Sequence, residues 1–238
     1  MRKIAGLLLL AGLVVGSGAE AKKNDKNNTK AKVAIDYLNS NFATYDKLQK
    51  SIWANPELGF LENNSSELLK QHLRENGFMI EEGVAGMPTA FVATYGSGKP
   101  VIGLLAEFDA LPGLSQDTVP YRKPIKENAP GQGCGHNTFG VASSAAAVSI
   151  SKWLTSNKKS GTIKVYGSPA EEGGAGKVYL VREGLFKDVD VVLDWHPSSR
   201  NAVTTNGGTA MVMVDYKFYG KPAHAAGNPG KDVRPSML

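Results

Sequence analysis

Four segments between residues 138 and 195 decide the fold class: TFGVASSAAAVSISKWLTS (138–156), TIKVYG (162–167), AGKVYLVREG (175–184) and VDVVLDW (189–195). The first and third have the small residues and apolar spacing of helices that pack on a sheet. The second and fourth are short apolar runs of strand length. Strands that alternate with helices indicate parallel strands joined by helical crossovers. We therefore predict an α/β domain with a largely parallel sheet covered by helices.

The residues before this stretch extend the pattern. An apolar stripe at three- and four-residue steps predicts a helix that ends before Asn55-Pro56, and a second helix is expected over 65–76, closed by Gly77. Two strand-like runs follow, 89–95 and 100–107, and Gly96-Ser97-Gly98 between them has the composition of a hairpin turn. The stripe consists of Leu38, Phe42, Tyr45, Leu48 and Ile52.

The first 32 residues carry the basic character of the chain. Arg2 and Lys3 precede an apolar run and the small-residue exit Ala19-Glu20-Ala21, which is typical of a cleaved signal peptide over residues 1–21. A retained membrane anchor is the alternative, which the shortness of the apolar run disfavours. Of the formal net charge of +5, residues 1–21 supply +1, and residues 22–32, interpreted as a basic flexible spacer, supply +4.

Residues 33–238 are therefore formally neutral, which removes the case for nucleic-acid binding. We expect an exported protein, periplasmic or secreted, that is not bound to a membrane once the signal has been cleaved. With 42% apolar residues, 21% charged residues and a single cysteine, the chain is expected to be globular and without an internal disulfide.

The pattern changes near residue 203. We assign residues 33–200 to the N-terminal part of one domain. Period-two alternation over 211–218 predicts a half-buried strand, so we assign residues 203–238 to the start of a second, smaller α+β domain. A segment of about 35 residues is too short to bury a core of its own, so this second domain is expected to be incomplete.

Three groups of metal-ligating residue types follow the predicted strands. Cys134 and His136 lie in a glycine-rich loop, Glu171-Glu172 follow the strand 162–167, and His196 directly follows the strand 189–195. Each group alone has an ordinary explanation as surface or core residues. Together they fall at one edge of a parallel sheet, where open α/β folds bind ligands. Thiolate, imidazole and carboxylate are ligands of Zn²⁺ and related ions, so the joint pattern predicts a metal site.

Several motifs occur in an order that resembles a known family. They are Pro56-Glu57-Leu58-Gly59, Ala106-Glu107-Phe108-Asp109-Ala110-Leu111-Pro112, Gly133-Cys134-Gly135-His136, Pro169-Ala170-Glu171-Glu172, the strand that ends at His196, and Gly220-Lys221-Pro222-Ala223-His224-Ala225-Ala226. From about residue 40 onward the chain is similar to the co-catalytic metallopeptidase and amidohydrolase family. Within that family it resembles the branch of aminobenzoyl-glutamate, hippurate and auxin-conjugate hydrolases, and the first of these most.

The resemblance implies roles for individual residues. It makes four residues ligands of two divalent metal ions, zinc or manganese, and makes Glu171 the general base that activates a water. His224, in a dimerisation (lid) domain, would reach the active site of the partner in a homodimer or a dimer of related subunits and polarise the scissile carbonyl. Asp109 is an expected orienting carboxylate, and Glu107 a possible supporting residue where relatives carry histidine. The four implied ligands are Cys134, His136, Glu172 and His196.

The implied activity is hydrolysis of the amide bond of a small N-acyl amino acid, with aminobenzoyl-glutamate or a similar conjugate as the expected substrate. One alternative makes Cys134 a nucleophile with His136 or His196 as its base, which leaves Glu171-Glu172 without a role. Another is a non-catalytic fragment of such an enzyme. Family members continue with more sheet and a last ligand histidine, for which His72, on a predicted helix face, is not a candidate. On that ground we expect the 238-residue chain itself to be inactive or to aggregate.

Overall fold

The computed structural model describes residues 25–203 and, after them, residues 210, 212, 214–217, 219, 220, 224, 226 and 227. The chain divides into two units, Met1–Ser198 and Ser199–Leu238. The described helices and strands all belong to the first unit. Residues 1–21, for which a signal peptide is predicted, lie outside the described residues, as does part of the strand expected over 211–218. The described residues of that second segment form no strand. The assignment of residues 203–238 to a dimerisation domain stays a prediction.

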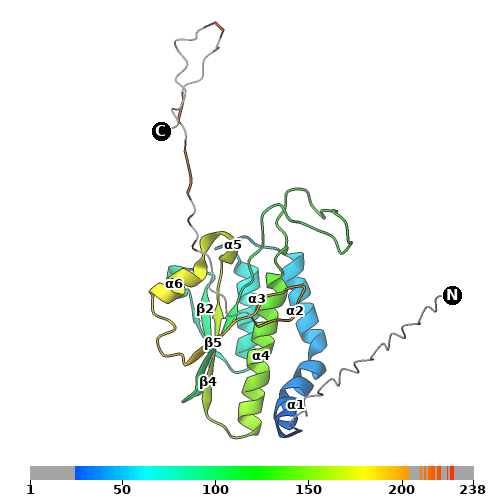
Figure 1. Ribbon diagram of the computed structural model, residues 1–238, viewed down its shortest axis with the longest axis vertical. Coiled ribbons are helices and arrows are strands. Elements are labelled where there is room, and N and C mark those ends of the chain that lie inside the picture. The colour runs from blue at the N-terminus through cyan, green and yellow to red at the C-terminus, as the bar shows by residue number, and fades with distance from the viewer. Residues whose placement is uncertain are drawn as a thin grey trace, which may run out of the picture. The chain divides into compact units, whose positions relative to one another are not determined.

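A five-stranded sheet forms the centre of the first unit (Figure 1). Its strands are β1 (Met79–Glu82), β2 (Phe91–Ser97), β3 (Val101–Ala106), β4 (Gly161–Gly167) and β5 (Val191–Leu193), in the order β1-β2-β4-β3-β5. β3 pairs in parallel with β4 and β5, whereas β2 is antiparallel to both of its neighbours. Four of the five described strands thus share one direction, and the predicted α/β class is confirmed with a mixed sheet.

The expected hairpin between the second and third strands is wrong. β4 lies between β2 and β3, and Val165 on β4 pairs with Ala93 on one side and Leu104 on the other. The segment after β2 bonds to the start of β4 instead of closing a hairpin: the Thr162 hydroxyl donates to the Gly98 carbonyl at 2.8 Å, and the Thr162 amide donates to the Pro100 carbonyl at 2.9 Å. The long helix between β3 and β4 allows β4 to return in parallel beside β3.

Four long helices stand beside the sheet in Figure 1: α1 (Asp25–Ser40), α2 (Phe42–Ala54), α3 (Asn63–Glu75) and α4 (His136–Ser156). α4 packs on β3 and β4, and α1, α2 and α3 contact α4. Shorter helices are the 3-10 turn η1 (Val84–Gly86), α5 (Glu171–Gly174) and α6 (Gly176–Arg182). The predicted helix ends near Asn55-Pro56 and Gly77 are confirmed by the ends of α2 and α3.

The two faces of the sheet pack into two separate hydrophobic cores, because successive residues of a strand point to opposite faces. Ala93, Leu104 and Val165 pack with apolar residues of α2, α3 and α4. On the opposite face Val92, Leu105 and Tyr166 pack with η1, with Leu180 of α6 and with the segment that follows α6. Because both faces are covered, the central strands β3 and β4 are buried along almost their whole length, as expected for parallel strands packed on both sides.

Two elements were not expected from the sequence. Residues 25–32, for which the sequence predicts a flexible spacer, are helical as the first part of α1. β1 has the sequence MIEE, and three of its four side chains are exposed, so it lacks the alternating or continuous apolar pattern that identifies a strand. Within the described part of the chain, no helix is both long and apolar enough to cross a membrane.

A leucine on α3 tests this packing. Leu69 is fully buried in the core between the sheet and the helices, so Leu69→Ala is expected to lower the free energy of unfolding by about 2–5 kcal/mol in urea denaturation. Leu61, which is 63% exposed just before α3, is the matched control, and Leu61→Ala should change stability by less than about 0.5 kcal/mol. Equal losses for the two variants would contradict the position of α3.

Candidate functional site

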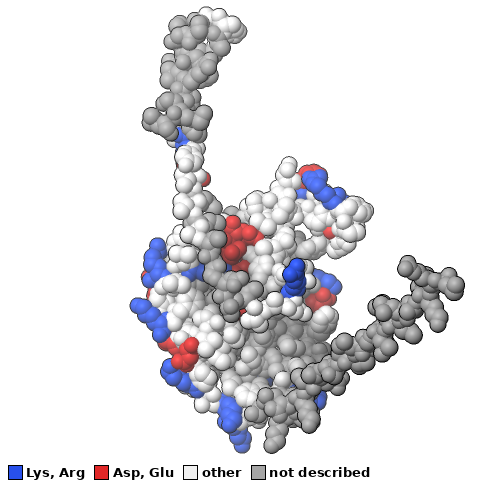
Figure 2. All heavy atoms as spheres, in the orientation of Figure 1, with Lys and Arg blue, Asp and Glu red and all other residues white. Residues whose placement is uncertain are grey.

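The predicted site residues of the first unit gather at one edge of the sheet. Glu107 and Asp109 follow β3, His136 opens α4, Glu171 opens α5 after β4, and His196 comes shortly after β5. These positions are at the carboxyl ends of the three parallel strands, where ligand sites of open α/β sheets lie. Figure 2 shows acidic side chains gathered over α5 at this end of the molecule.

His136 is held by a buried carboxylate. Its ring is fully buried, and Nδ1 lies 2.9 Å from Oδ1 of Asp109, to which it donates. The second oxygen of Asp109 accepts the backbone N–H of Glu172 at 2.9 Å. A proton on Nδ1 leaves the Nε2 lone pair of the neutral ring available, which is the usual arrangement of a metal-binding histidine. Asp109 therefore contacts both His136 and the turn that carries the two glutamates.

The opposite nitrogen of His136 faces two carboxylates without a hydrogen bond. Nε2 lies 2.9 Å from Oε2 of Glu107 and 4.0 Å from Oε2 of Glu171. Despite the short contact, His136 Nε2 and Glu107 Oε2 are both buried without a hydrogen-bond partner in the described part of the chain, and so is Oε1 of Glu172. Buried polar atoms are almost always paired, so three unpaired atoms at one edge of the sheet fit a site built for a cation.

Cys134 and His196 complete the cluster. Cys134 Sγ lies 3.3 Å from His196 Nε2. His196 Nδ1 donates to the Pro197 carbonyl at 2.9 Å, so the lone pair of the neutral ring is on Nε2, facing Cys134. Two groups of possible ligand atoms lie within 4.8 Å of one another: Cys134, His136 and His196, and Glu107, His136 and Glu171. The two groups share His136, so the edge offers sulfur, nitrogen and oxygen donors to more than one ion.

Gly135 makes this arrangement possible. It has φ +80°, in the left-handed region that favours glycine, and it turns the chain between Cys134 and His136. A Cβ atom built on Gly135 would lie 3.2 Å from the ring of Pro197. The absence of a side chain thus lets the loop of Cys134 approach the loop of His196 closely.

The carboxylates shift the acid–base properties of their neighbours. Burial of His136 opposes its charge, but Asp109 and Glu107 outweigh this effect and raise its pKa to about 10. Burial and the nearby Glu172 carboxylate raise the pKa of the Cys134 thiol to about 12. Burial, together with Glu107, also raises the pKa of Glu171 above its usual range. The metal-free site therefore holds a protonated thiol and a protonated imidazole at neutral pH.

Lys177 is a site residue that the sequence did not indicate. Its ammonium group contacts Oε1 of Glu107, which is buried after β3. Burial tends to raise the pKa of Glu107, but His136 and Lys177 outweigh burial and lower it. The only sign of this contact in the sequence is a lysine in the first turn of a short helix, which is an ordinary surface pattern.

Two other histidines are described, one on α3 and one in the second unit. His72, on α3, packs edge to face against Tyr45 with ring centroids 5.3 Å apart. His224 belongs to the second unit, where it is exposed and its Nδ1 accepts the Gly227 amide at 2.9 Å. Its expected role at an active site stays a prediction.

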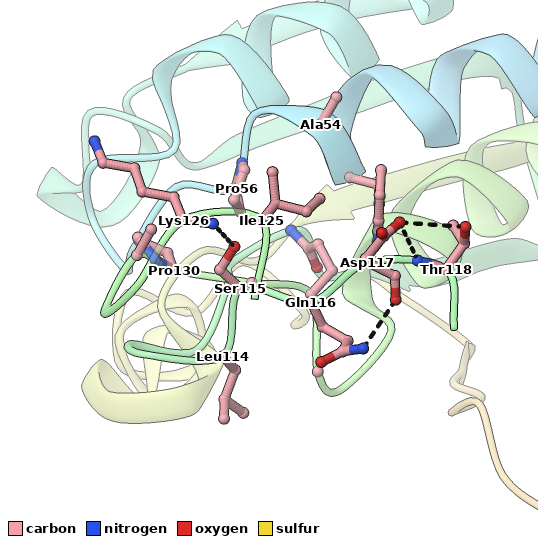
Figure 3. Close-up of a pocket in the computed structure, with 15 residues that line it drawn as sticks. Ala54, Pro56, Leu114, Ser115, Gln116, Asp117, Thr118, Ile125, Lys126 and Pro130 are labelled. Carbon is pink, nitrogen blue, oxygen red and sulfur yellow. Dashed lines mark hydrogen bonds between the residues drawn. The ribbon is translucent and has the colours of Figure 1, made fainter. Parts of the chain in front are cut away.

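A separate cavity of about 420 Å³ lies between the end of α2 and the loop 114–133 (Figure 3). Leu114, Ile125 and Pro130 give it apolar walls, and Lys126 and Asp117 line it as well. None of its lining residues belongs to the groups of possible ligands. The possible metal ligands therefore lie at the ends of the strands and not in this cavity.

The single cysteine of the chain allows a direct test of the site. Because the pKa of Cys134 is raised to about 12, iodoacetamide at pH 8 is expected to alkylate the metal-free protein at least about tenfold more slowly than a free thiol. Glu172→Gln removes a neighbouring charge and should increase the rate measured by mass spectrometry. Glu183→Gln, at an exposed position after α6, is the matched control. Alkylation of the unaltered protein as fast as a free thiol would contradict this electrostatic description.

Known proteins with similar sequences agree with the fold and the motifs. A subunit of p-aminobenzoyl-glutamate hydrolase from Escherichia coli (strain K12) is 42% identical over 197 residues, which cover 82% of this chain and 40% of that protein. Hippurate hydrolase of Campylobacter jejuni is 36% identical over 154 residues, which cover 64% of this chain and 39% of that protein. The chain thus spans about two-fifths of the length of these curated relatives.

A solved structure and a family model also match this chain. The crystal structure of a dinuclear metal-binding peptidase of family M20 from Bacillus subtilis matches 66% of this chain and 43% of that chain, with a TM-score of 0.53 and 22% identity, a likeness of fold. The model of peptidase family M20/M25/M40 matches residues 103–230, which are more than half of the chain. With the α/β sheet and the clustered strand ends already described, this match establishes that the chain belongs to peptidase family M20/M25/M40.

Proposed function

We propose that the protein is a metal-dependent amidohydrolase that cleaves the amide bond of an N-acyl amino acid. The observation that carries this proposal is that two groups of possible metal-ligand atoms, which share His136, each lie within 4.8 Å of one another where the parallel strands end. When such ligand atoms lie beside an exposed carboxylate, a bound metal ion can activate a water and the carboxylate can accept its proton.

Cys134, His136, Glu172 and His196 are the proposed ligands of two divalent ions, with Zn²⁺ or Mn²⁺ as the candidates. The thiol and the imidazoles favour a softer ion, and the carboxylates suit a harder one. When bound, the ions would supply Lewis acidity, which lowers the pKa of a water and polarises an amide oxygen. Asp109 would orient His136 and the Glu172 turn, through the hydrogen bonds described above.

Glu171 is the proposed general base. Its side chain is 42% exposed, and its Oε2 lies 4.0 Å from His136 Nε2, so it borders the ligand cluster and remains open to a substrate. The raised pKa of Glu171 brings it closer to neutral pH, where a carboxylate takes up and returns a proton most efficiently. Glu171 would accept the proton of the attacking water and give it to the leaving amine. His224 is proposed to polarise the scissile carbonyl in the active site of the partner in a dimer.

Similarity to the relatives named above supports p-aminobenzoyl-glutamate or a similar conjugate as the substrate. The proposal also includes a dimer, either of this protein or with a related subunit, and export to the periplasm or the medium, on the sequence pattern of residues 1–21. A panel of N-acyl amino acids, assayed with the product of the complete reading frame, tests the substrate.

The alternative with Cys134 as a nucleophile is disfavoured by the site. A nucleophilic cysteine needs a lowered pKa, but burial and the carboxylates raise the pKa of Cys134 to about 12. Dialysis against a chelator separates the two mechanisms. We expect activity to be lost on dialysis and restored by Zn²⁺ or Mn²⁺. Full activity after dialysis that alkylation then abolishes would refute the metal mechanism.

Replacement of Glu171 tests the general base. Because a positioned proton-transfer group contributes about 10²–10⁴-fold to rate, Glu171→Gln is expected to lower kcat by about that factor with bound metal unchanged. Glu81→Gln, at an exposed position on β1, is the control and should leave kcat unchanged. Loss of metal from Glu171→Gln, in parallel with the loss of activity, would make Glu171 a ligand instead.

Metal binding is expected to release protons. At pH 8 the thiol of Cys134 and the Nε2 of His136 are both protonated in the metal-free protein, since their pKa values are about 12 and about 10. Binding of Zn²⁺ should therefore release about two protons, measured by calorimetry in buffers of different ionisation enthalpy. Cys134→Ser should release one proton fewer. Binding without proton release would show that neither side chain is a ligand.

A further inference from the structure

A buried glutamate outside the ligand cluster contacts the turn that carries Glu171 and Glu172. Glu62 is fully buried, just before α3. Its Oε1 accepts the backbone N–H of Ala170 at 2.7 Å, and its Oε2 accepts the hydroxyl of Thr89 at 2.8 Å. No ion pair to Glu62 is found among the described residues. A carboxylate without a neighbouring cation is costly to bury, so the buried position of Glu62 calls for an explanation.

Glu62 does not serve the helix that it precedes. An acidic side chain at this place ordinarily accepts N–H groups of the first helical turn, but the carboxylate of Glu62 makes no such bond. Glu57 does so instead, because its two carboxylate oxygens accept the backbone N–H groups of Asn64 and Ser65 at 2.9 and 2.8 Å. The carboxylate of Glu62 is thus directed away from α3, toward a residue 108 positions later in the chain.

The residue that Glu62 contacts has an unfavourable backbone conformation. Ala170 has φ +54° and ψ +42°, in the left-handed region that costs a residue with a side chain about 1–2 kcal/mol. Its Cβ fits only because two neighbours lack one: a Cβ built on Gly59 or on Gly174 would lie 2.8 Å from it. The conformation of Ala170 sets the direction in which the chain enters α5, and hence where Glu171 and Glu172 point.

We propose that Glu62 is a positioning residue, which holds Ala170 in its left-handed conformation and thereby directs Glu171 and Glu172 into the site. The roles of those two glutamates rest on the proposed function. The hydrogen bond by which Glu62 holds the backbone of Ala170, called the clamp below, does not depend on that function. Glu62 touches none of the possible ligand atoms, so it acts through the turn alone.

Substitutions at position 62 separate this role from simple stabilisation. Glu62→Met keeps the length of the side chain but removes both acceptors, and Glu62→Asp withdraws the carboxylate from Ala170 by one methylene should the first variant fail to fold. Glu62→Gln keeps an oxygen that can accept the Ala170 amide. Ser66→Ala is the matched control, because the buried Ser66 hydroxyl donates to the Thr89 carbonyl at 2.8 Å in the same region without contacting Ala170.

Hydrogen exchange of the peptide 168–176 is the first measurement and requires no metal. Glu62→Met, or Glu62→Asp in its place, should raise the exchange rate of this peptide at least about tenfold, while Ser66→Ala and Glu62→Gln leave it within about threefold of the unaltered protein. Adding Ala170→Gly to Glu62→Met should restore part of the protection, because glycine adopts the left-handed conformation without strain. Unchanged exchange in the Glu62 variants, or an equal rise in Ser66→Ala, would overturn the proposal.

Titration with Mn²⁺ is the second measurement. Glu62→Met is expected to weaken Mn²⁺ binding about 10–100-fold, the range seen when supporting residues of metal sites are lost, and Ser66→Ala should bind as the unaltered protein does. If the unaltered protein binds neither Mn²⁺ nor Zn²⁺, the proposed function fails, and the exchange data still decide the role of Glu62. If exchange rises while Mn²⁺ binding stays unchanged, the clamp does not direct the glutamates and the proposal is refuted.

Discussion

The site depends on one carboxylate that joins the ends of two strands to the start of a helix. Asp109 follows β3, binds the ring of His136 at the start of α4 with one oxygen, and accepts the amide of Glu172 after β4 with the other. Both oxygens are occupied and the side chain is buried, so neither partner can move without breaking a charge-assisted hydrogen bond in a low-dielectric environment. The relative positions of the imidazole and the two glutamates therefore follow from the parallel pairing of β3 with β4, which brings these loops to the same edge.

The carboxylates at this edge outnumber the cationic side chains that contact them. Glu107, Asp109, Glu171 and Glu172 meet at the edge, and the described contacts give them one lysine and one imidazole. Burial, and after it the neighbouring carboxylates Glu107 and Glu172, raise the pKa values of Glu171 and Cys134 respectively. A divalent cation would offset the excess negative charge and pair the buried oxygen and nitrogen atoms that lack partners. The same features that destabilise the metal-free site thus favour the loaded one.

The sequence alone predicts those features of the fold and the site that are encoded by patterns of neighbouring residues. The alternation of apolar helices and strands predicts the α/β class. The placement of Glu171 and His196 at strand ends, with Cys134 in the loop before a helix, predicts their meeting at one edge. What it misses depends on distant pairing. Gly96-Ser97-Gly98 has the composition of a hairpin, but composition does not reveal that β4, more than 60 residues later, inserts between β2 and β3. Lys177 and Glu62 resemble surface residues in the sequence, and only the fold brings their charges to buried partners.

The turn before α5 shows how a weak local element can hold reactive side chains. α5 has four residues, too few for a helix to be stable by its own hydrogen bonds, and residues in left-handed conformation flank it on both sides. Two buried carboxylates hold it from separate elements: Glu62 accepts the amide of Ala170, and Asp109 accepts the amide of Glu172. Glu171 lies between these two fixed amides. Its backbone is therefore determined from both sides, while its side chain makes no hydrogen bond among the described residues and stays free to exchange a proton.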